Sequence, residues 1–215
     1  MTRPGSSLRI AYLHGFNSGP TSIKGRQLGD AIAKLVEATR PQYFLPQLHD
    51  RPREAMRTVE RWIRGSESGS EVDFIGADLT LVGSSLGGFY ATYLAERLGA
   101  KAVLINPAIR PFESLAVYLG PQVNPYTGVT YQLTREHFAE LEALSVPRIT
   151  HPERYFLLVQ SGDELLDYRT AVAYYAGAWQ FVQGGGDHAY RDFAAQIPAV
   201  LHFAGVELPT GSERR

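Results

Sequence analysis

The chain of 215 residues contains no cysteine. This absence excludes disulfides, a cysteine nucleophile and every metal site built on cysteine thiolates. The histidines also lack the H-E-x-x-H spacing and any other metal-binding pattern, so we expect no metal and no other cofactor. Reactive groups must therefore be sought among the oxygen- and nitrogen-bearing side chains.

Long hydrophobic runs and an excess of one charge are also missing. Every apolar run is far shorter than the about 18 residues that a membrane-spanning helix needs. The net charge is −1 with both signs interspersed, which indicates no surface for nucleic acid or anionic membranes. Met1–Ser7 has no hydrophobic segment of the signal-peptide kind. We expect a cytoplasmic protein with no nucleic-acid or membrane partner, and the oligomeric state is left open.

Linkers, internal repeats and low-complexity blocks are absent as well. With 44% hydrophobic residues, the chain can bury one substantial core. The most hydrophilic stretch, Gly65–Glu71, is typical of an exposed loop and not of a domain boundary. The sequence therefore predicts a single domain over residues 1–215.

Apolar runs alternate along the chain with segments of helical periodicity. Between the runs, apolar residues at helical spacing predict helices, most clearly from Leu86 to Leu98. This alternation favours an α/β fold with a mainly parallel sheet of about six strands and helices on both faces. The predicted strands are Leu8–Leu13, Tyr43–Pro46, Leu79–Val82, Lys101–Ile105, Tyr155–Gln160 and Trp179–Val182.

Residues 106–152 are too many for an ordinary connection between two strands. They contain a predicted turn at Asn124–Gly128 and a predicted helix from Glu136 to Leu144. Insertions at this point of an α/β sheet can cover the carboxyl ends of the strands, where ligands bind. We interpret the insertion as a small lid or pocket wall, with a surface excursion of no function as the alternative.

The most informative motif is G-x-S-x-G, formed by Gly83–Gly87 between a predicted strand and a predicted helix. In this context the serine lies on a sharp, strained turn that exposes its hydroxyl, and glycines are needed where strand and helix crowd together. The motif predicts Ser85 as a nucleophile and an α/β-hydrolase fold. Ser84 is the weaker candidate because Val82 and Leu86, two residues away on either side, do not suit the turn.

A serine nucleophile needs a base, and the base needs an orienting acid. In α/β-hydrolases these follow in the order serine, acid, histidine. Asp163 comes just after the fifth predicted strand, and His188 follows the sixth through a glycine-rich loop. Because parallel strands end at one edge of the sheet, we expect Ser85, His188 and Asp163 to form a catalytic triad.

Other acids and histidines fit less well. Asp167 has the position of a helix N-cap, and Glu164 is one residue farther from the strand end. Asp187 is adjacent to His188, so a hydrogen bond between the two side chains would need awkward geometry. We expect the histidines without a partner motif to be surface or structural residues, namely His49, His137, His151 and His202.

The first predicted strand ends at His14-Gly15-Phe16. The turn after this strand supplies a backbone donor in the fold, so we expect the N–H groups of Phe16 and Leu86 to form the oxyanion hole. His14 is predicted to pack or hydrogen-bond within the turn and to transfer no proton. Thr21–Ser22 predicts a helix cap, with a phosphate site at that helix N-terminus as the alternative.

Several segments resemble the YqiA-type bacterial esterases of the α/β-hydrolase superfamily. The resemblance runs from near residue 10 to near residue 204, and the tail, Gly205–Arg215, lies outside it and is expected to be loose. It implies hydrolysis of carboxylic esters in the bacterial cytoplasm by Ser85, Asp163 and His188, with short acyl esters and acyl-CoA thioesters as candidate substrates. The matching segments are Tyr12–Ser18, Val82–Gly88, Asn106–Glu113, Asn124–Gly128, Gly162–Tyr175 and Gly185–Ala189.

Substrate-binding residues are less well determined. Arg110 could bind a carboxylate or phosphate of the substrate, but pairing with Glu113 to brace the insertion is the favoured alternative. Tyr118, Tyr126 and Tyr131 could line an aromatic pocket or simply pack the insertion.

We expect a serine esterase or thioesterase that works through an acyl-enzyme. The same triad also fits an acyltransferase, a peptidase or a lyase. A non-catalytic ligand-binding protein on the same fold is the alternative from another class, since fold does not dictate function. The intact triad argues against that alternative.

Overall fold

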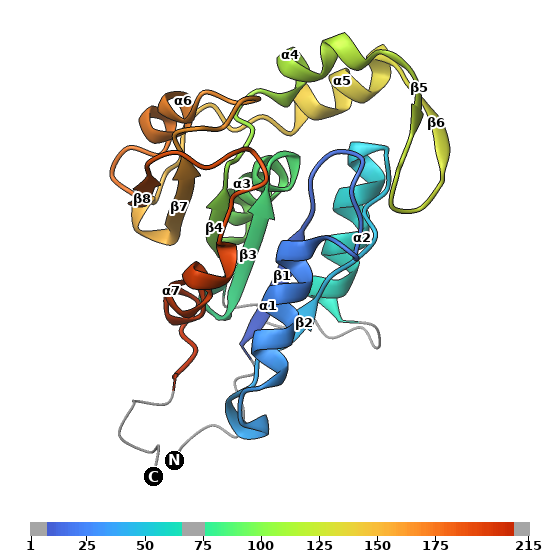
Figure 1. The fold of residues 1–215 in the computed structure, drawn as a ribbon. Helices are drawn as coiled ribbons and strands as arrows, with labels where there is room; N and C mark the ends of the chain where they lie inside the picture. Colours follow the sequence, from blue (N-terminus) through green and yellow to red (C-terminus); the bar gives the residue numbers. More distant parts are fainter. Residues whose placement is uncertain (1–7, 66–75, 209–215) are drawn as a thin grey trace.

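Residues 8–65 and 76–208 are described by the computed structural model. The N-terminus, Met1–Ser7, nearly all of the loop predicted at Gly65–Glu71, and residues 209–215 of the predicted loose tail lie outside the described residues. Six parallel strands form one sheet in the order β2-β1-β3-β4-β7-β8 (Figure 1). Their bounds are β1 (Arg9–Leu13), β2 (Gln42–Phe44), β3 (Leu79–Ser84), β4 (Lys101–Ile105), β7 (Tyr155–Gln160) and β8 (Trp179–Gln183).

All six predicted strands are present, and their ends differ from the prediction by two residues at most. The chain passes from β1 to β2 on one side and then returns to form β3 on the other side of β1. The carboxyl ends of β1 and β3 are therefore a point where the strand order reverses, the usual position of a ligand site in an open α/β sheet. In this register Leu13 of β1 pairs with Gly83 of β3.

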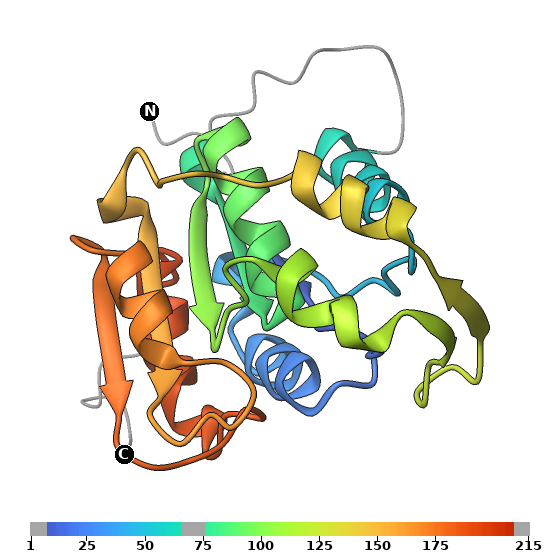
Figure 2. The same ribbon diagram turned by 90° about the horizontal axis from the view of Figure 1, so that it is seen from above.

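Helices cover both faces of the sheet, as predicted (Figure 1, Figure 2). One face packs against α1 (Ile23–Ala33) and α7 (Ile197–Phe203), and the other against α2 (Pro52–Arg64), α3 (Leu86–Leu98) and α6 (Tyr168–Tyr174). Because side chains alternate along a strand, each strand contributes to two separate cores. In β1, Ala11 and Leu13 pack on the α2 and α3 side, whereas Ile10 and Tyr12 pack on the α1 and α7 side.

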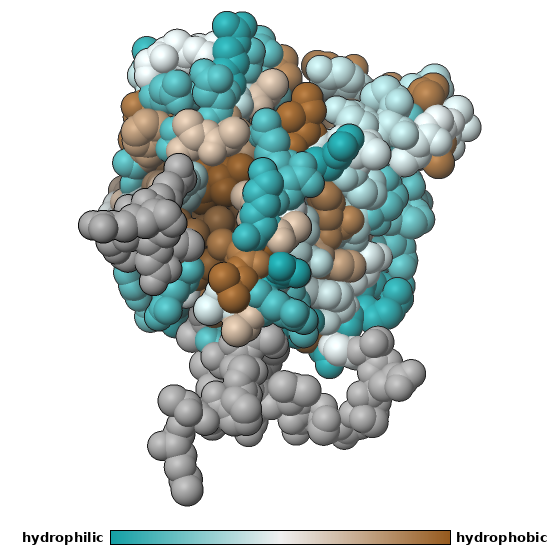
Figure 3. All heavy atoms as spheres, turned by 60° about the horizontal axis from the view of Figure 1, so that its bottom comes forward, coloured by the Kyte–Doolittle hydropathy of each residue, from teal (hydrophilic) through white to brown (hydrophobic). Residues whose placement is uncertain are grey.

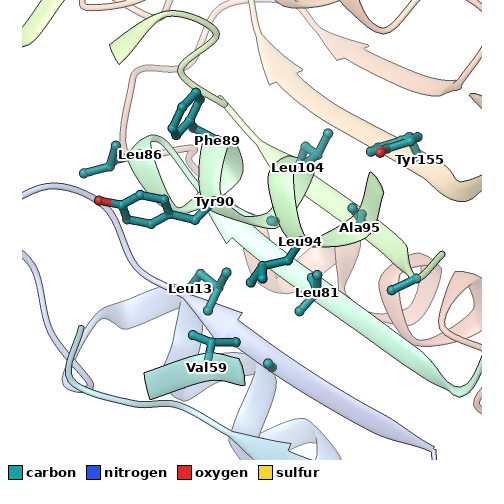
Figure 4. Packing of buried hydrophobic residues seen from close by; sticks show 14 of the residues in the cluster. Leu13, Val59, Leu81, Leu86, Phe89, Tyr90, Leu94, Ala95, Leu104 and Tyr155 are labelled. Atoms are coloured by element: carbon teal, nitrogen blue, oxygen red, sulfur yellow. The ribbon is translucent and has the colours of Figure 1, made fainter. Parts of the chain in front are cut away.

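The larger core lies between the sheet and the helices α2 and α3 (Figure 4). Leu13, Leu81 and Leu104 come from three strands and meet Val59 of α2 and Leu94 of α3, all fully buried. Full burial of one leucine side chain contributes roughly 1.5–3 kcal/mol to the free energy of folding. This packing fixes the position of α3, whose N-terminus carries Ser85.

The insertion of residues 106–152 lies across the carboxyl ends of the strands (Figure 1, Figure 2). The predicted helix and the predicted turn are both present, and the turn joins two short antiparallel strands that the sequence did not reveal. Each strand has only four residues, and the first begins with Gly120-Pro121, which is atypical of a strand. The elements are α4 (Pro111–Ser114), the 3₁₀ helix η3 (Leu115–Tyr118), β5 (Gly120–Val123), β6 (Thr130–Leu133) and α5 (Arg135–Ala143).

Hydrogen bonds attach this hairpin to the loop after β1. Asn17 Nδ2 donates to Gln122 Oε1 at 3.1 Å, and Asn124 Nδ2 donates to the carbonyl oxygen of Ser18 at 2.8 Å. The hydroxyl of Tyr131 donates to Asn17 Oδ1 at 2.8 Å. The insertion is thus held against the segment from which we expect an oxyanion donor.

The opposite end of the molecule shows hydrophobic residues between hydrophilic ones (Figure 3). None of the described helices has the length and apolar character needed to cross a membrane. Four further 3₁₀ helices complete the described elements. These 3₁₀ helices are η1 (Glu37–Thr39), η2 (Gly76–Asp78), η4 (Pro152–Arg154) and η5 (Phe193–Gln196).

Candidate active site

Ser85 lies on the turn between β3 and α3, in a conformation that non-glycine residues rarely adopt. Its φ is 55° and its ψ is −121°, so the backbone is strained there. The surrounding structure stabilises this turn: the Ser85 N–H donates to the carbonyl oxygen of Ile105, and the Ser85 carbonyl accepts the N–H groups of Gly88 and Ala108. The elbow predicted from the sequence is present.

Gly87, the last residue of the G-x-S-x-G motif, is required because the backbones of α3 and β1 are in close contact there. A Cβ atom at Gly87 would overlap the carbonyl oxygen of Leu13, because α3 begins directly beside the end of β1. Any side chain here would force the helix away from the sheet. The close approach of β1 and α3 therefore brings the loop after β1 next to Ser85.

Ser85, His188 and Asp163 are in hydrogen-bond contact. His188 Nε2 lies 3.0 Å from Ser85 Oγ, and His188 Nδ1 lies 3.0 and 2.9 Å from the two carboxylate oxygens of Asp163. Because the carboxylate of Asp163 accepts a hydrogen bond from Nδ1–H, it favours the tautomer in which Nε2 is unprotonated and faces Ser85. The three side chains have the arrangement in which a serine hydroxyl can lose its proton to the imidazole.

The carboxyl group of Asp163 is held in its ionised form. Burial favours a higher pKa, but hydrogen bonds from His188 and from the amides of Leu166 and Leu165 outweigh it and hold the pKa below its usual range. The Asp163 side chain is only 2% exposed. A buried carboxylate beside Nδ1 stabilises a positive charge on the imidazole.

Buried amide side chains hold the loop that carries His188. Asn106 Nδ2 donates to the carbonyl oxygens of Asp187 and His188 at 3.0 and 3.1 Å. Gln160 Oε1 accepts the amides of Asp187 and Arg191 at 3.1 and 2.9 Å. Both residues are almost fully buried, and Asn106 Oδ1 also accepts the Gln160 amide at 3.0 Å. The position of the imidazole therefore depends on the side chains of Asn106 and Gln160.

Glu164 has a role that the sequence did not indicate. It is not the acid of the site, but its Oε2 accepts the backbone amide of His188 at 3.0 Å. Asn106, Gln160 and Lys24, which lines the cleft, were also missed as site residues. A signal existed for Gln160, since it is the polar last residue of a wholly buried strand, whereas nothing distinguished Lys24.

The two amides expected to form the oxyanion hole are free. Within the described part of the chain, the N–H groups of Phe16 and Leu86 have no hydrogen-bond acceptor. Leu86 is the first residue of α3, where helix amides are unpaired. A Cβ atom at Gly15 would lie 3.3 Å from the Cβ of Ser85, so the loop carrying Phe16 passes directly beside Ser85. Both amides remain predicted donors.

His14 stabilises this loop, in agreement with its predicted structural role. Its Nε2 accepts the amide of Leu48 at 3.0 Å, and its Nδ1 lies 3.0 Å from the carbonyl oxygen of Gly15. Burial lowers the pKa of His14, although the Gly15 carbonyl opposes the shift. The ring is therefore neutral and acts as a hydrogen-bond link between two loops.

A cleft of about 390 Å³ contains Ser85 and His188. Tyr118 and Tyr126 line it and stay predicted substrate-binding residues, and the Tyr118 ring lies 5.9 Å from the ring of Phe16. Tyr131 instead lines a neighbouring hollow of about 220 Å³ that it shares with Phe16. The other lining residues are mostly apolar, including Leu86, Leu115, Val117, Leu165 and Leu166.

Arg110 is placed by the structure outside this cleft. Its guanidinium pairs with Glu113 at 2.8 Å and lies 5.4 Å from the centre of the Phe112 ring. The alternative that Arg110 braces the insertion is therefore the one that the structure favours, and the substrate-binding role is not supported.

Of three other predicted structural roles, two are borne out and one is wrong. Asp167 caps α6 by accepting the amide of Arg169 at 2.9 Å. Ser22 occupies the N-cap of α1, but its hydroxyl accepts no amide, contrary to the expected cap. His137 is buried and forms a capping box with Thr134 of α5. No group of three potential metal-ligating His, Asp or Glu side chains occurs among the described residues.

Known structures share this fold. Alpha/beta hydrolase domain-containing protein 10 from mouse superimposes with a TM-score of 0.61 at 15% identity, covering 92% of this chain and 89% of that one. Est1E from Butyrivibrio proteoclasticus gives 0.59 at 13% identity, covering 93% and 86%. The esterase domain of a Rhodothermus marinus protein gives 0.57 at 15% identity, covering 92% and 87%. The protein therefore has the α/β-hydrolase fold.

Sequence comparison identifies the family within this fold. The model described as "Uncharacterised protein family (UPF0227)" matches residues 9–205, so the chain belongs to the UPF0227 family, and the resemblance to YqiA-type proteins is confirmed. A UPF0227 protein from Shewanella baltica (strain OS185) is 25% identical over 206 residues, which cover 90% of this chain and 98% of the relative.

Proposed function

We propose that the protein is a serine hydrolase that cleaves carboxylic esters of short acyl chains through an acyl-enzyme. The observation that carries the proposal is the continuous hydrogen-bonded series from Ser85 Oγ through His188 to Asp163, with separations of 3.0 and 2.9 Å. The fold shared with Est1E and with the Rhodothermus marinus esterase domain supports it.

The proposed reaction follows from the geometry. His188 Nε2 takes the proton of Ser85 as the hydroxyl oxygen attacks the ester carbonyl, and the amides of Phe16 and Leu86 donate to the developing oxyanion. His188 then gives the proton to the leaving alcohol or thiol, and Asp163 stabilises the imidazolium. Water repeats the sequence in the second half and releases the acid.

The shape and lining of the cleft favour a small, apolar acyl group. Leu115, Val117 and Tyr118 of the insertion face the same cavity as Ser85. A volume of about 390 Å³ is at the low end of sites for small molecules, so short acyl chains fit best. Thioesters with the same acyl group are attacked by the same mechanism.

The decisive test is hydrolysis of 4-nitrophenyl acetate and butyrate by the wild type and by Ser85→Ala. We expect the variant to lose at least a thousandfold in kcat, because no other group can form the acyl-enzyme. Ser145→Ala, a change at an exposed residue of the insertion, is the matched control and should keep full activity.

The pH dependence of activity completes this test. Activity should rise from acidic toward neutral pH, because only the neutral form of the base can accept the Ser85 proton. A folded wild type that hydrolyses neither ester, or a Ser85→Ala variant as active as the wild type, would rule out the proposal.

A further inference from the structure

A second cavity adjoins the cleft on the side of α1. It has a volume of about 330 Å³ and is lined by Tyr12, Ser22 and Tyr190, among other residues. Gly15, Lys24 and Ala189 line both this cavity and the cleft that contains Ser85. The two spaces therefore lie side by side, and a molecule bound at Ser85 can extend from one into the other. We call the second space the side cavity.

Polar side chains also line the side cavity. Among the described residues, the Tyr190 hydroxyl has no hydrogen-bond partner, although the residue is only 3% exposed. The Ser22 hydroxyl lies within interaction distance of the Tyr12 hydroxyl. Buried polar atoms are normally paired within the protein or with a bound molecule. The Tyr190 hydroxyl thus points to an occupant that can accept a hydrogen bond.

Lys24 supplies a positive charge at the boundary between the two spaces. Its Nζ donates to the carbonyl oxygen of Ala189 at 2.6 Å. An ammonium group has three N–H donors, and within the described chain the other two have no acceptor. Burial lowers the pKa of Lys24 to about 8, opposed by the carboxylates of Asp187 and Asp163, so the group is still mainly charged at neutral pH.

The first turn of α1 adds to the positive potential. This helix of 11 residues has no acidic residue in its first turn and no side-chain cap, and Ser22, Ile23 and Lys24 of that turn line the side cavity. Helix N-termini favour anions. Of the remaining charged residues on the cavity, Arg191 is paired with Asp187 at 2.7 Å, and Asp192 is exposed.

The position relative to His188 indicates which part of the substrate reaches the side cavity. In the proposed mechanism His188 protonates the leaving alcohol or thiol, so the leaving group lies near His188. Lys24 binds the carbonyl of Ala189, the residue that follows His188. The apolar residues Leu115 and Val117 of the insertion line the cleft but not the side cavity, and they suit the acyl group.

We propose that the side cavity binds an anionic group, a carboxylate or a phosphate, on the alcohol or thiol part of the substrate, with Lys24 as the residue that selects it. This inference rests on the proposed esterase function. It deepens that function by naming the charge of the leaving group.

The test compares two esters that differ in one carboxylate, 4-nitro-3-(butanoyloxy)benzoate and 2-nitrophenyl butyrate. The quantity measured is the ratio of their kcat/KM values, anionic over neutral, in the wild type and in Lys24→Met. We expect the variant to lower this ratio at least tenfold, mainly through KM of the anionic ester. Lys34→Met, which removes an exposed lysine at the other end of α1, should leave the ratio unchanged.

The ratio separates selection from a purely structural role. If Lys24 only positions Ala189, both esters lose activity equally, the ratio stays constant and the inference is overturned. If the ratio falls as expected, inhibition of anionic-ester hydrolysis by inorganic phosphate and by benzoate shows which anion the site prefers.

A direct titration keeps the inference testable if neither ester is hydrolysed. Inorganic phosphate and benzoate are titrated calorimetrically into Ser85→Ala and into Ser85→Ala/Lys24→Met. Saturable binding that disappears with the lysine supports the anion site even though the esterase proposal fails. Absence of binding to both proteins overturns the site.

Discussion

The two sides of the cleft around Ser85 are built in different ways. On the histidine side, the loop that carries His188 is held by the buried side chains of Asn106 and Gln160 and by Glu164. On the insertion side, large apolar residues are exposed, with Val117 at 83% and Tyr118 at 46%, and few hydrogen bonds join the hairpin to the loop after β1.

This difference suits two different tasks. A proton transfer requires the imidazole to be placed within a fraction of an ångström, and buried hydrogen bonds to both carbonyls and amides of its loop provide that precision. In the proposed reaction, an acyl pocket requires only apolar surface of a suitable size, which the exposed side chains of η3 supply. We therefore expect changes on the histidine side to affect kcat and changes on the insertion side to affect KM.

Among the residues that support the two sides of the cleft, the largest effect should come from Asn106→Asp. This change removes the amide that donates to the carbonyls of Asp187 and His188 and places a carboxylate beside them, so the His188 loop must shift. We expect kcat for 4-nitrophenyl butyrate to fall about tenfold to hundredfold, or roughly 1.4–2.7 kcal/mol in the barrier.

The same substitution on the insertion side, Asn124→Asp, is the matched control. Asn124 donates to the carbonyl of Ser18 and lies away from the imidazole, so kcat should change less than about threefold. Equal losses of kcat in the two variants would show that the two sides do not differ as proposed. Thermal melts of both proteins separate unfolding from a local effect.

A moderate effect is expected from Tyr118→Ser. The variant removes the ring contact with Phe16 and part of the apolar lining, which should raise KM for a hexanoyl ester roughly threefold to tenfold, because such contacts contribute about 0.5–1.5 kcal/mol. The melting temperature should change little, since the residue is half exposed. A fall in kcat with constant KM would place Tyr118 in the chemistry instead.

The smallest effect concerns pH. Because burial lowers the pKa of Lys24 to about 8, its ammonium form predominates below that pH and its neutral form above it. The preference for the anionic ester should therefore be present at pH 7 and decline through pH 8 to 9. The charged groups around it, Asp163, Asp187, Arg191 and His188, act on both esters, so the ratio of kcat/KM values cancels much of their contribution.

The conservative variant Lys24→Arg sharpens this test. An arginine keeps its charge across the whole range, so the preference should persist at pH 9. A preference that declines equally in both proteins would assign the titration to another group.

The sequence by itself determined the fold and the identity of the central residues. Alternation of buried runs predicted the parallel sheet, and the strained G-x-S-x-G turn selected Ser85 because the close packing of β1, β3 and α3 leaves no room for side chains at its glycines. Strand ends at one edge then predicted that Asp163 and His188 lie beside it. These predictions are possible because a local pattern marks each strand and each residue at its end, and a parallel sheet brings those ends to one edge.

Tertiary structure alone decided what supports and surrounds these residues. Asn106, Gln160 and Glu164 reach the His188 loop from positions 24 to 82 residues away in the chain, and no local pattern encodes such contacts. Lys24 lies on an ordinary helix and becomes part of the cleft only because α1 packs beside the loop after β8. Which polar atoms face a cavity depends on how distant elements pack, and that information is spread over the whole chain.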